Sequence, residues 1–322
     1  MTSKGGRRSR RSKKPLIVAG LVAFLALDLT LVAYALGGPR TGAAQTTEPG
    51  AGLRPTASTA PSTPAEDTPI PTASATADLD APTMFLSPVD ATIAYRVAAK
   101  SCDTTGSVLL ERTVDAGATW QSSVVTTDLR SPLSLQAVDS SYAYLVGLGG
   151  DSCIPGLTAT YTSGVGFQAY PDRVAAAWYL DTTTPNSVHS PLGSASIPCD
   201  AMRLATMDGQ RALVLCSDRQ VAETLDGGQT WSERATVQGA QSAAATADGY
   251  VIARTGVEGC DGVSVSSVPS ASAVPPTTLG CASSFTQAAQ NPGVITVGVG
   301  SGSIWITDGT SSSVSQDGGV TW

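Results

Sequence analysis

Thr224-Leu225-Asp226-Gly227-Gly228-Gln229-Thr230-Trp231 is the stretch on which the fold prediction rests, because its frame, [ST]-x-D-x-G-x-T-W, occurs three times in the chain. The fixed positions are Thr113, Asp115, Gly117, Thr119 and Trp120 in the first copy, Thr224, Asp226, Gly228, Thr230 and Trp231 in the second, and Ser315, Asp317, Gly319, Thr321 and Trp322 in the third. A motif that returns at intervals predicts a repeated structural unit.

The residue types of this frame suit a tight turn between two strands. An aspartate carboxylate is short enough to accept hydrogen bonds from backbone N–H groups of its own turn. The glycine two residues later adopts a positive φ at no steric cost, and the tryptophan covers the turn with a flat apolar surface. Alternating side chains before each copy favour strand, turn, strand. We therefore interpret the three aspartates as structural residues and not as catalysts or metal ligands.

With these copies, residues 83–322 resemble the Asp-box β-propellers of the bacterial neuraminidase repeat family. That family includes sialidases, sortilin-type ectodomains and photosystem II assembly factors. The resemblance implies an all-β fold of roughly five to seven blades of short antiparallel sheets. It also implies that the motif residues are turns remote from any substrate.

The spacing of the copies agrees with blades that lie between them. The aspartates are separated by 111 and 91 residues, each about two units of a 40–55-residue blade. A degenerate copy that lost its aspartate is predicted at Thr162–Phe167. Strands are predicted at segments that include Ala175–Leu180, Ala212–Cys216, Phe285–Ala289 and Ser303–Thr307. The segment around Met84–Leu86 is predicted to add the outer strand of the last blade and so to close the ring.

The N-terminal region predicts a membrane anchor. Residues 1–14 form a basic cytoplasmic arm, and residues 15–36 are apolar over a length that spans a bilayer. The positive flank predicts that the C-terminal side lies outside the cell. The alternative is a cleavable signal peptide with Ala33-Tyr34-Ala35 as its processing site. Asp28 interrupts the apolar run, and its role stays open between a partner helix, a protonated acid and a signal-peptide boundary.

Residues 37–82 are rich in Pro, Thr, Ser and Ala. Such a segment buries too little apolar surface to offset the entropy of ordering it, so a disordered stalk is predicted. From residue 39 onward the chain has 12 Lys and Arg against 25 Asp and Glu. This acidic balance argues against nucleic acid as a partner. The predicted anchor and its positive flank together predict a single-pass protein of a bacterial cell membrane, with the propeller extracytoplasmic.

Six cysteines lie in residues 83–322, and an even count in an oxidising compartment predicts disulfides. Of the 15 connectivities that six cysteines allow, we predict pairing between neighbours: Cys102–Cys153, Cys199–Cys216 and Cys260–Cys281. A zinc site is the alternative, but the sequence has no C-x-x-C pair and one histidine. No metal or cofactor is expected.

Catalytic residues are hard to assign. A sialidase needs an arginine triad with a Tyr/Glu pair, and other glycoside hydrolases need two facing carboxyl groups. The Arg-Ile-Pro signature of sialidases is absent, and Glu111 and Glu223 fall where strand alternation points them to solvent. His189 has no G-x-S-x-G partner and is interpreted as a hydrogen-bonded loop residue. Trp178 and Tyr179 are interpreted as core residues.

The sequence therefore favours a non-enzymatic binding or scaffold module that recruits a protein or glycan at the cell surface. The alternatives are an exo-sialidase-like glycoside hydrolase, whose arginines would converge at the channel mouth, and an assembly factor for a membrane complex.

Overall fold

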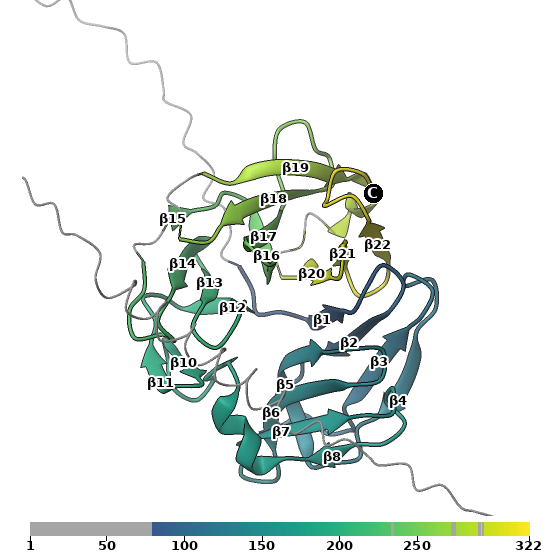
Figure 1. The fold of residues 1–322 in the computed structure, drawn as a ribbon, viewed down its shortest axis with the longest axis vertical. Helices are drawn as coiled ribbons and strands as arrows, with labels where there is room; N and C mark the ends of the chain where they lie inside the picture. The colour runs from purple at the N-terminus through teal and green to yellow at the C-terminus, as the bar shows by residue number, and fades with distance from the viewer. Residues whose placement is uncertain (1–78, 233–234, 272–274, 289–290, 292) are drawn as a thin grey trace, which may run out of the picture. The chain divides into compact units, whose positions relative to one another are not determined.

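A computed structural model describes residues 79–322 except 233–234, 272–274, 289–290 and 292. Six antiparallel sheets stand around a central axis and form a six-bladed β-propeller (Figure 1). The first three sheets contain β1 (Met84–Pro88), β2 (Ala94–Ala98), β3 (Leu109–Thr113) and β4 (Gln121–Val124); β5 (Leu129–Ala137), β6 (Ala143–Gly149), β7 (Ile154–Thr160) and β8 (Gln168–Ala169); and β9 (Tyr179–Leu180), β10 (Ser187–Ser190) and β11 (Gly193–Ser196). The other three contain β12 (Ala201–Thr206), β13 (Ala212–Cys216), β14 (Gln220–Thr224) and β15 (Ala235–Thr236); β16 (Ala240–Ala245), β17 (Gly249–Arg254), β18 (Val263–Pro269) and β19 (Thr277–Ala282); and β20 (Thr296–Gly300), β21 (Ser303–Thr307) and β22 (Ser312–Ser315).

The hydrophobic core lies between neighbouring sheets. Each of the six sheet–sheet interfaces contains one cluster of buried apolar side chains. Between the first two sheets, for example, Tyr95 and Leu110 pack against Leu145. Alternation of side chains along each strand supplies both faces of a sheet, so every sheet is sandwiched by its neighbours.

The predicted mode of ring closure is wrong. Met84–Pro88 is the innermost strand of the first sheet, where it pairs with β2 in the register Met84↔Ala98, and it adds nothing to the last sheet. A short connection makes this local pairing cheaper in loop entropy than pairing with a strand more than 200 residues away. The ring closes by packing: the Thr296 hydroxyl donates to the Met84 carbonyl (3.3 Å), and Pro88 lies against Gly298.

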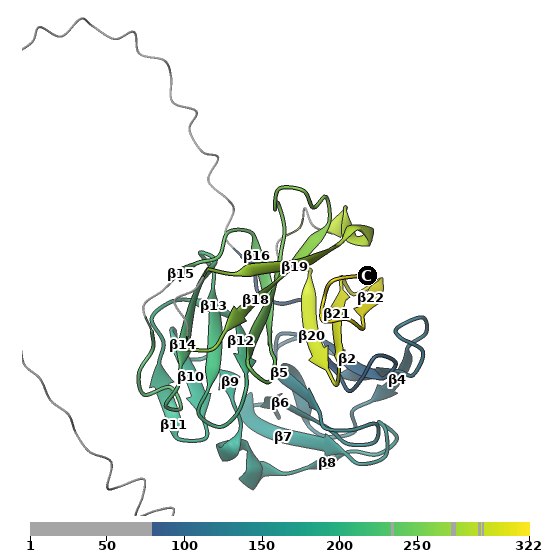
Figure 2. The same cartoon turned by 45° about the horizontal axis from the view of Figure 1, so that its top comes forward.

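The third sheet departs from the prediction and from the other sheets. The predicted strand Ala175–Leu180 is mostly wrong, because Pro171–Ala176 forms the 3₁₀ helix η1 and only Tyr179–Leu180 is a strand. Proline fixes φ for a helical start, and the following alanines lack the β-branched side chains that favour strands. β9 contacts both β5 and β12, the inner strands of the neighbouring sheets, and Figure 2 shows the three strands close together.

The direction of β9 shows which strand is missing from the third sheet. We call the face of the propeller that carries the repeated turns the turn face. In the other sheets the first strand runs toward this face. After β1, for instance, the Thr92 carbonyl accepts the N–H of Ala116, which belongs to the first motif turn. Trp178, just before β9, donates its indole N–H to Asp208 in the β12–β13 turn (2.9 Å). Tyr95 of β2 and Trp305 of β21 donate to the next sheet in the same way. β9 therefore corresponds to a second strand, and the third sheet has no inner first strand.

Two further features concern the ends of the chain and the fifth sheet. The predicted strand Phe285–Ala289 is wrong over its described residues, 285–288: Phe285 ends the 3₁₀ helix η2 (Ser283–Phe285), which buries it, and β19 ends just before this helix. The predicted arm 1–14, anchor 15–36 and most of the stalk 37–82 lie outside the described residues. Within the described ranges, no helix has the length and apolar character needed to cross a bilayer.

Three disulfides join the pairs that the sequence predicts. Cys102–Cys153 connects the β2–β3 and β6–β7 loops and so links the first two sheets. Cys199–Cys216 spans the β12–β13 hairpin, and Cys260–Cys281 spans the fifth sheet from the loop before β18 to β19. The second and third bonds each tie a loop residue to a strand of the same sheet, Cys216 in β13 and Cys281 in β19.

Candidate functional site

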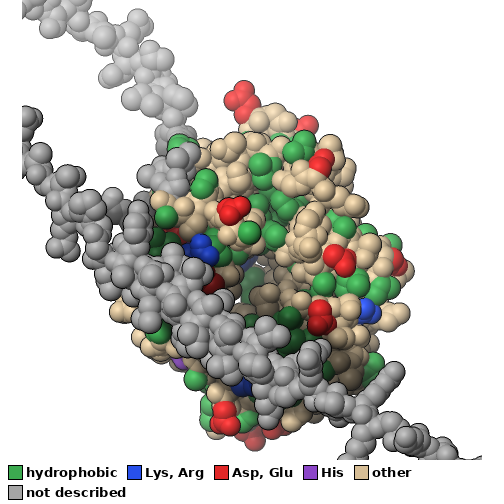
Figure 3. All heavy atoms as spheres, in the orientation of Figure 1, with side chains coloured by type: hydrophobic (Ala, Val, Ile, Leu, Met, Phe, Trp, Pro, Cys, Tyr) green, Lys and Arg blue, Asp and Glu red, His purple; other side chains and the backbone are tan. Residues whose placement is uncertain are grey.

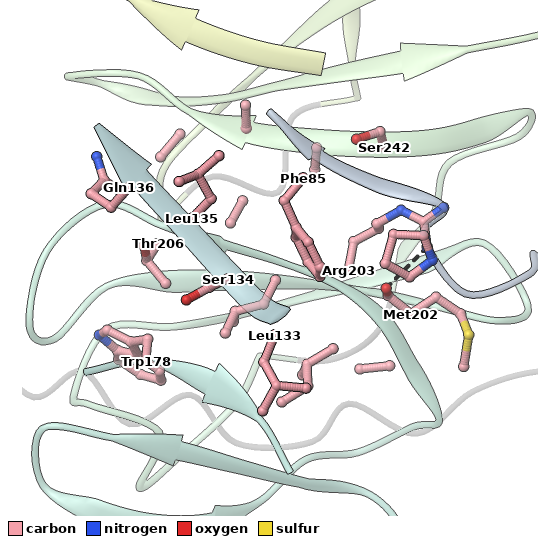
Figure 4. A pocket seen from close by; sticks show the side chains of 18 of the residues that line it. Phe85, Leu133, Ser134, Leu135, Gln136, Trp178, Met202, Arg203, Thr206 and Ser242 are labelled. Carbon is pink, nitrogen blue, oxygen red and sulfur yellow. Dashed lines mark hydrogen bonds between the residues drawn. The ribbon is translucent and has the colours of Figure 1, made fainter. Parts of the chain in front are cut away.

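A cavity of about 900 Å³ lies at the centre of the ring. Its wall consists of the innermost strands β1, β5, β12, β16 and β20, together with β9 and the loop after it. Figure 4 shows the side chains converging on it from different strands. The lining includes Phe85, Leu133, Ser134, Leu135, Gln136, Trp178, Met202, Arg203, Thr206 and Ser242.

The cavity extends between the two faces of the propeller. Asp208 and Gly209 line it at the turn face, and the β9–β10 loop, from Thr182 to Asn186, lines it at the opposite face. Where grey atoms do not cover this view, Figure 3 shows a hollow at the centre of the ring. An elongated ligand can therefore lie along the axis.

The chemistry of the wall is mainly apolar with dispersed hydrogen-bonding groups. Leu133, Leu135 and Leu204 supply apolar surface, and Ser134 and Thr206 supply hydroxyls. This combination is typical of binding sites that bury apolar ligand surface and fix its orientation with few polar contacts.

Arg203 is the one arginine in the described lining, and it is buried in the wall. Its guanidinium donates to the carbonyls of Asp80 (2.9 Å), Met202 (3.0 Å) and Gly293 (3.2 Å). Its Nε has no hydrogen-bond partner among the described residues. Burial lowers the pKa of Arg203 to about 10, although the negative charge of Asp80 acts to raise it. The group therefore remains a fixed cation at neutral pH.

Two of the three carboxyl groups in the described lining, those of Asp181 and Asp208, are held by turns, and the third belongs to Asp200. Asp208 accepts the backbone N–H groups of Gln210 and Arg211 (both 2.8 Å), which lowers its pKa. Partial burial acts to raise the pKa of Asp181, but hydrogen bonds from Thr183 and Thr184 outweigh it and lower the pKa. Both groups are ionised at neutral pH; Asp208 forms an ion pair with Arg211 (2.7 Å), whereas Asp181 has no ion pair among the described residues.

The same turn recurs elsewhere, and the sequence reasoning missed it. An aspartate accepts the N–H groups two and three residues ahead at Asp90, Asp139 and Asp308 as well. The sign in the sequence is an isolated Asp, with Thr, Ser or Gln two residues on, between two strand-like segments.

The three motif copies form near-identical turns in the first, fourth and sixth sheets. In the second copy, the Asp226 carboxylate accepts the N–H of Thr230 (2.9 Å) and the hydroxyls of Thr224 (2.9 Å) and Thr230 (2.6 Å). The Gly228 N–H donates to the Thr224 hydroxyl (2.9 Å). Thr113, Asp115, Gly117 and Thr119 make the same bonds in the first copy, and Ser315, Asp317, Gly319 and Thr321 make them in the third.

Each motif tryptophan packs beside its own turn or an adjoining core cluster. Trp120 lies under the Arg96 guanidinium (4.0 Å), Trp231 packs on the cluster between the third and fourth sheets, and Trp322 packs on the cluster between the fifth and sixth. Hydrogen bonds, with those from Thr321 foremost, lower the pKa of Asp317 to about 2. None of the fifteen motif residues is among the described residues that line the central cavity.

The degenerate copy at Thr162–Phe167 follows the same plan without a carboxylate. The Thr162 hydroxyl accepts the Gly166 N–H (2.8 Å), and the Thr160 hydroxyl accepts the Gly164 N–H (2.9 Å). Ser163 and Gly164 both have positive φ, as Ala116 and Gly117 do in the first copy. The hydroxyl of Thr162 therefore takes the place of the aspartate.

The remaining candidate residues do not form a catalytic cluster. Arg96 pairs with Glu111 (2.7 Å), and Glu223 accepts hydrogen bonds from the Ser270 hydroxyl and the Ala271 N–H. His189 lies in β10 instead of the predicted loop; its ring stacks on Tyr179 and its Nδ1 bonds the Ala177 carbonyl (2.9 Å).

Trp178 and Tyr179 both pack in the core, as predicted, and Trp178 also reaches the cavity. Tyr179 packs in the core between the second and third sheets. Trp178 packs between the third and fourth sheets and also lines the cavity, which the core interpretation missed.

A comparison with protein-family models finds no match, and a comparison with curated proteins finds none either. Solved structures similar to the chain include YCF48 bound to D1 peptide (14% identity, TM-score 0.28, 71% of this chain and 66% of that chain). They also include the Niastella koreensis GH74 enzyme (10%, 0.37, 72% and 45%) and YCF48 from Cyanidioschyzon merolae (14%, 0.27, 74% and 66%). This chain thus spans just under two thirds of the YCF48 chains and less than half of the GH74 chain. At these identities the similarity is one of fold.

Proposed function

We propose that the chain is a non-enzymatic binding or scaffold module, tethered to the bacterial membrane, that holds a protein or glycan partner in its central cavity. The observation that carries the proposal is the continuous cavity itself, with its apolar wall and dispersed hydroxyls. A rigid ring built from six sheets keeps this wall in place without a partner.

The carboxyl groups favour binding over glycoside hydrolysis. A glycosidase needs an acid whose pKa is raised, facing a second carboxylate. Of the three carboxyl groups in the described cavity lining, those of Asp181, Asp200 and Asp208, the first and the last have lowered pKa values and are engaged by turn N–H groups. A sialidase would also bring three arginines together, whereas Arg203 stands alone in the described lining.

The architecture that we propose around this site has four parts. Residues 1–14 are cytoplasmic, 15–36 cross the membrane, 37–82 form the stalk and 83–322 carry the propeller. Three disulfides support an oxidising, extracytoplasmic location for the propeller. The hydrogen bonds of the three motif turns support their assignment to the Asp-box class.

The test is site-specific photocrosslinking of the full chain in bacterial cells. We expect a photoreactive residue at Ser134, in the cavity, to capture a partner, and one at the exposed Gln121 on the outer strand β4 to capture none. A Thr206→Trp substitution, which narrows the cavity, should reduce the Ser134 adduct more than about tenfold. Adducts that form equally at Gln121, or that survive Thr206→Trp, would refute the proposal. Hydrolysis of sialosides by the purified chain would favour the enzyme instead.

A further inference from the structure

The geometry of the third sheet points to the chemistry of the ligand. We infer that an extended peptide segment of another protein adds to the open inner edge of β9 as an extra strand inside the cavity. This inference rests on the proposed function, because it names the ligand class for the same site. Strand addition is an established way for a sheet edge to recognise a peptide.

The hydrogen-bond pattern shows which groups face the cavity. Leu180 is opposite Val188 and Tyr179 is opposite His189 in the antiparallel pair β9–β10. Asp181 donates its N–H to the Ser187 carbonyl (3.0 Å), so residues 181 and 179 are the hydrogen-bonded members of this pair. In an antiparallel ladder the intervening residues point their N–H and C=O groups the other way. The backbone groups of Trp178 and Leu180 therefore point away from β10, toward the axis.

These edge groups are open. The backbone N–H and C=O of Trp178 and Leu180 have no hydrogen-bond partner among the described residues. Both residues line the cavity. Tyr179, whose backbone groups pair with β10, is not among the described lining residues. In each of the five other sheets, a first strand pairs with the strand equivalent to β9. A peptide strand would supply that missing pairing.

Nothing on β9 blocks such pairing. Native proteins protect exposed strand edges with Lys, Pro or a bulge. β9 and the residues beside it, Trp178 and Asp181, include none of these. A peptide strand that pairs with these groups gives each of them a protein hydrogen bond, and such bonds contribute net affinity in apolar surroundings.

The surroundings specify the side chains of the peptide. β5 and β12 flank β9, with Leu133 and Leu135 on one side and Leu204 on the other, so apolar side chains fit the central positions. One end of β9 lies near an ionised carboxylate without a cationic partner among the described residues, because Asp181 directly follows the strand. Lys or Arg at the matching end of the peptide would complement this charge.

The experiment uses the full chain in detergent micelles and a phage-displayed library of random peptides as the probe. We expect panning to enrich peptides with alternating apolar residues and a Lys or Arg at the end that lies near Asp181. The best peptide is then synthesised with single backbone N-methyl groups. Methylation on one set of alternate residues should weaken binding about tenfold or more, and methylation on the other set should change it little, because only one set faces the edge. Equal effects on both sets, or no enrichment, would overturn the inference.

Two measurements locate the binding on the protein. Leu180→Pro removes an N–H that β10 does not use, and should abolish binding. The matched control is Val314→Pro on β22, which is the outer strand of the sixth sheet within the described residues. Because the Asp308 N–H donates to the Ser311 carbonyl, the alternation along β22 points the N–H of Val314 away from β21. In the unaltered chain, hydrogen exchange at the Leu180 amide should slow at least tenfold when peptide binds.

Other outcomes separate this inference from the proposed function. Protection of the Leu180 amide before any peptide is added would show that another part of the chain already occupies the edge, and would overturn the inference. A peptide that binds Leu180→Pro as tightly as the parent, but is blocked by Thr206→Trp, would refute strand addition and leave the cavity as the binding site. A peptide indifferent to both substitutions would count against both.

Discussion

At the scale of single residues, the motif turns depend on a hydroxyl as much as on the aspartate. Thr113, Thr224 and Ser315 end their strands almost completely buried, and each hydroxyl both donates to the carboxylate and accepts a glycine N–H. Thr160 is buried in the same place in the degenerate copy and accepts the Gly164 N–H, although Thr162 replaces the aspartate there. The buried hydroxyl is thus common to all four turns.

Replacing Thr224 by valine tests this dependence. The substitution keeps the shape of the side chain but leaves the buried Gly228 N–H without its acceptor, and an unsatisfied buried donor costs about 1–3 kcal/mol. We expect the free energy of unfolding, measured by urea denaturation, to fall by that amount. Thr182→Val, at an exposed loop position, is the control and should change little. Equal stability of the two variants would show that the hydroxyl is dispensable.

At the scale of elements, two opposing effects decide how much each disulfide contributes to the free energy of unfolding. Cross-linking over 51 residues, as Cys102–Cys153 does, contributes about 4 kcal/mol through chain entropy, and the 17 residues of Cys199–Cys216 contribute about 3 kcal/mol. Cys199 and Cys216 are buried, however, and removing two buried sulfurs costs about 1.5 kcal/mol more.

We therefore expect the double alanine variant at Cys199 and Cys216 to lose about 4.5 kcal/mol of unfolding free energy, slightly more than the variant at Cys102 and Cys153. Urea denaturation of both variants beside the parent measures the difference. A loss at Cys102–Cys153 that exceeds the other by more than about 1 kcal/mol would show that loop length outweighs burial.

The sequence predicts those elements whose local pattern agrees with their tertiary role. Ala212–Cys216 and Ser303–Thr307 have the predicted bounds because apolar, β-branched runs end in turn residues there. Ala175–Leu180 reads as a strand from its apolar residues, yet Pro171 starts a helix just before it. The open edge of β9 is invisible in the sequence, because it depends on which neighbouring strand is absent. The cavity wall is equally hidden, since its residues come from strands spread over the whole chain.

At the scale of the whole molecule, the ring holds together only if its first and last sheets fit closely. These sheets share a cluster in which Leu86 and Ala94 pack against the fully buried Trp305. No strand is shared across this junction, so packing and a few hydrogen bonds close the ring. The junction should therefore be more sensitive to added volume than the face of a single strand.

Gly298→Ala tests the closure directly. A Cβ at Gly298 in β20 would lie 2.6 Å from Pro88 Cδ and 2.9 Å from its Cγ, so β1 and β20 would have to separate. Overpacking of this kind costs about 1–3 kcal/mol, and we expect a matching loss of unfolding free energy in urea denaturation. Gly156→Ala in β7 is the matched control, because a Cβ there meets nothing within 4 Å, and it should be neutral or slightly stabilising. If Gly298→Ala proved as stable as Gly156→Ala, the junction between the first and last sheets would be looser than the packing of Pro88 requires, and the ring would not depend on it for closure.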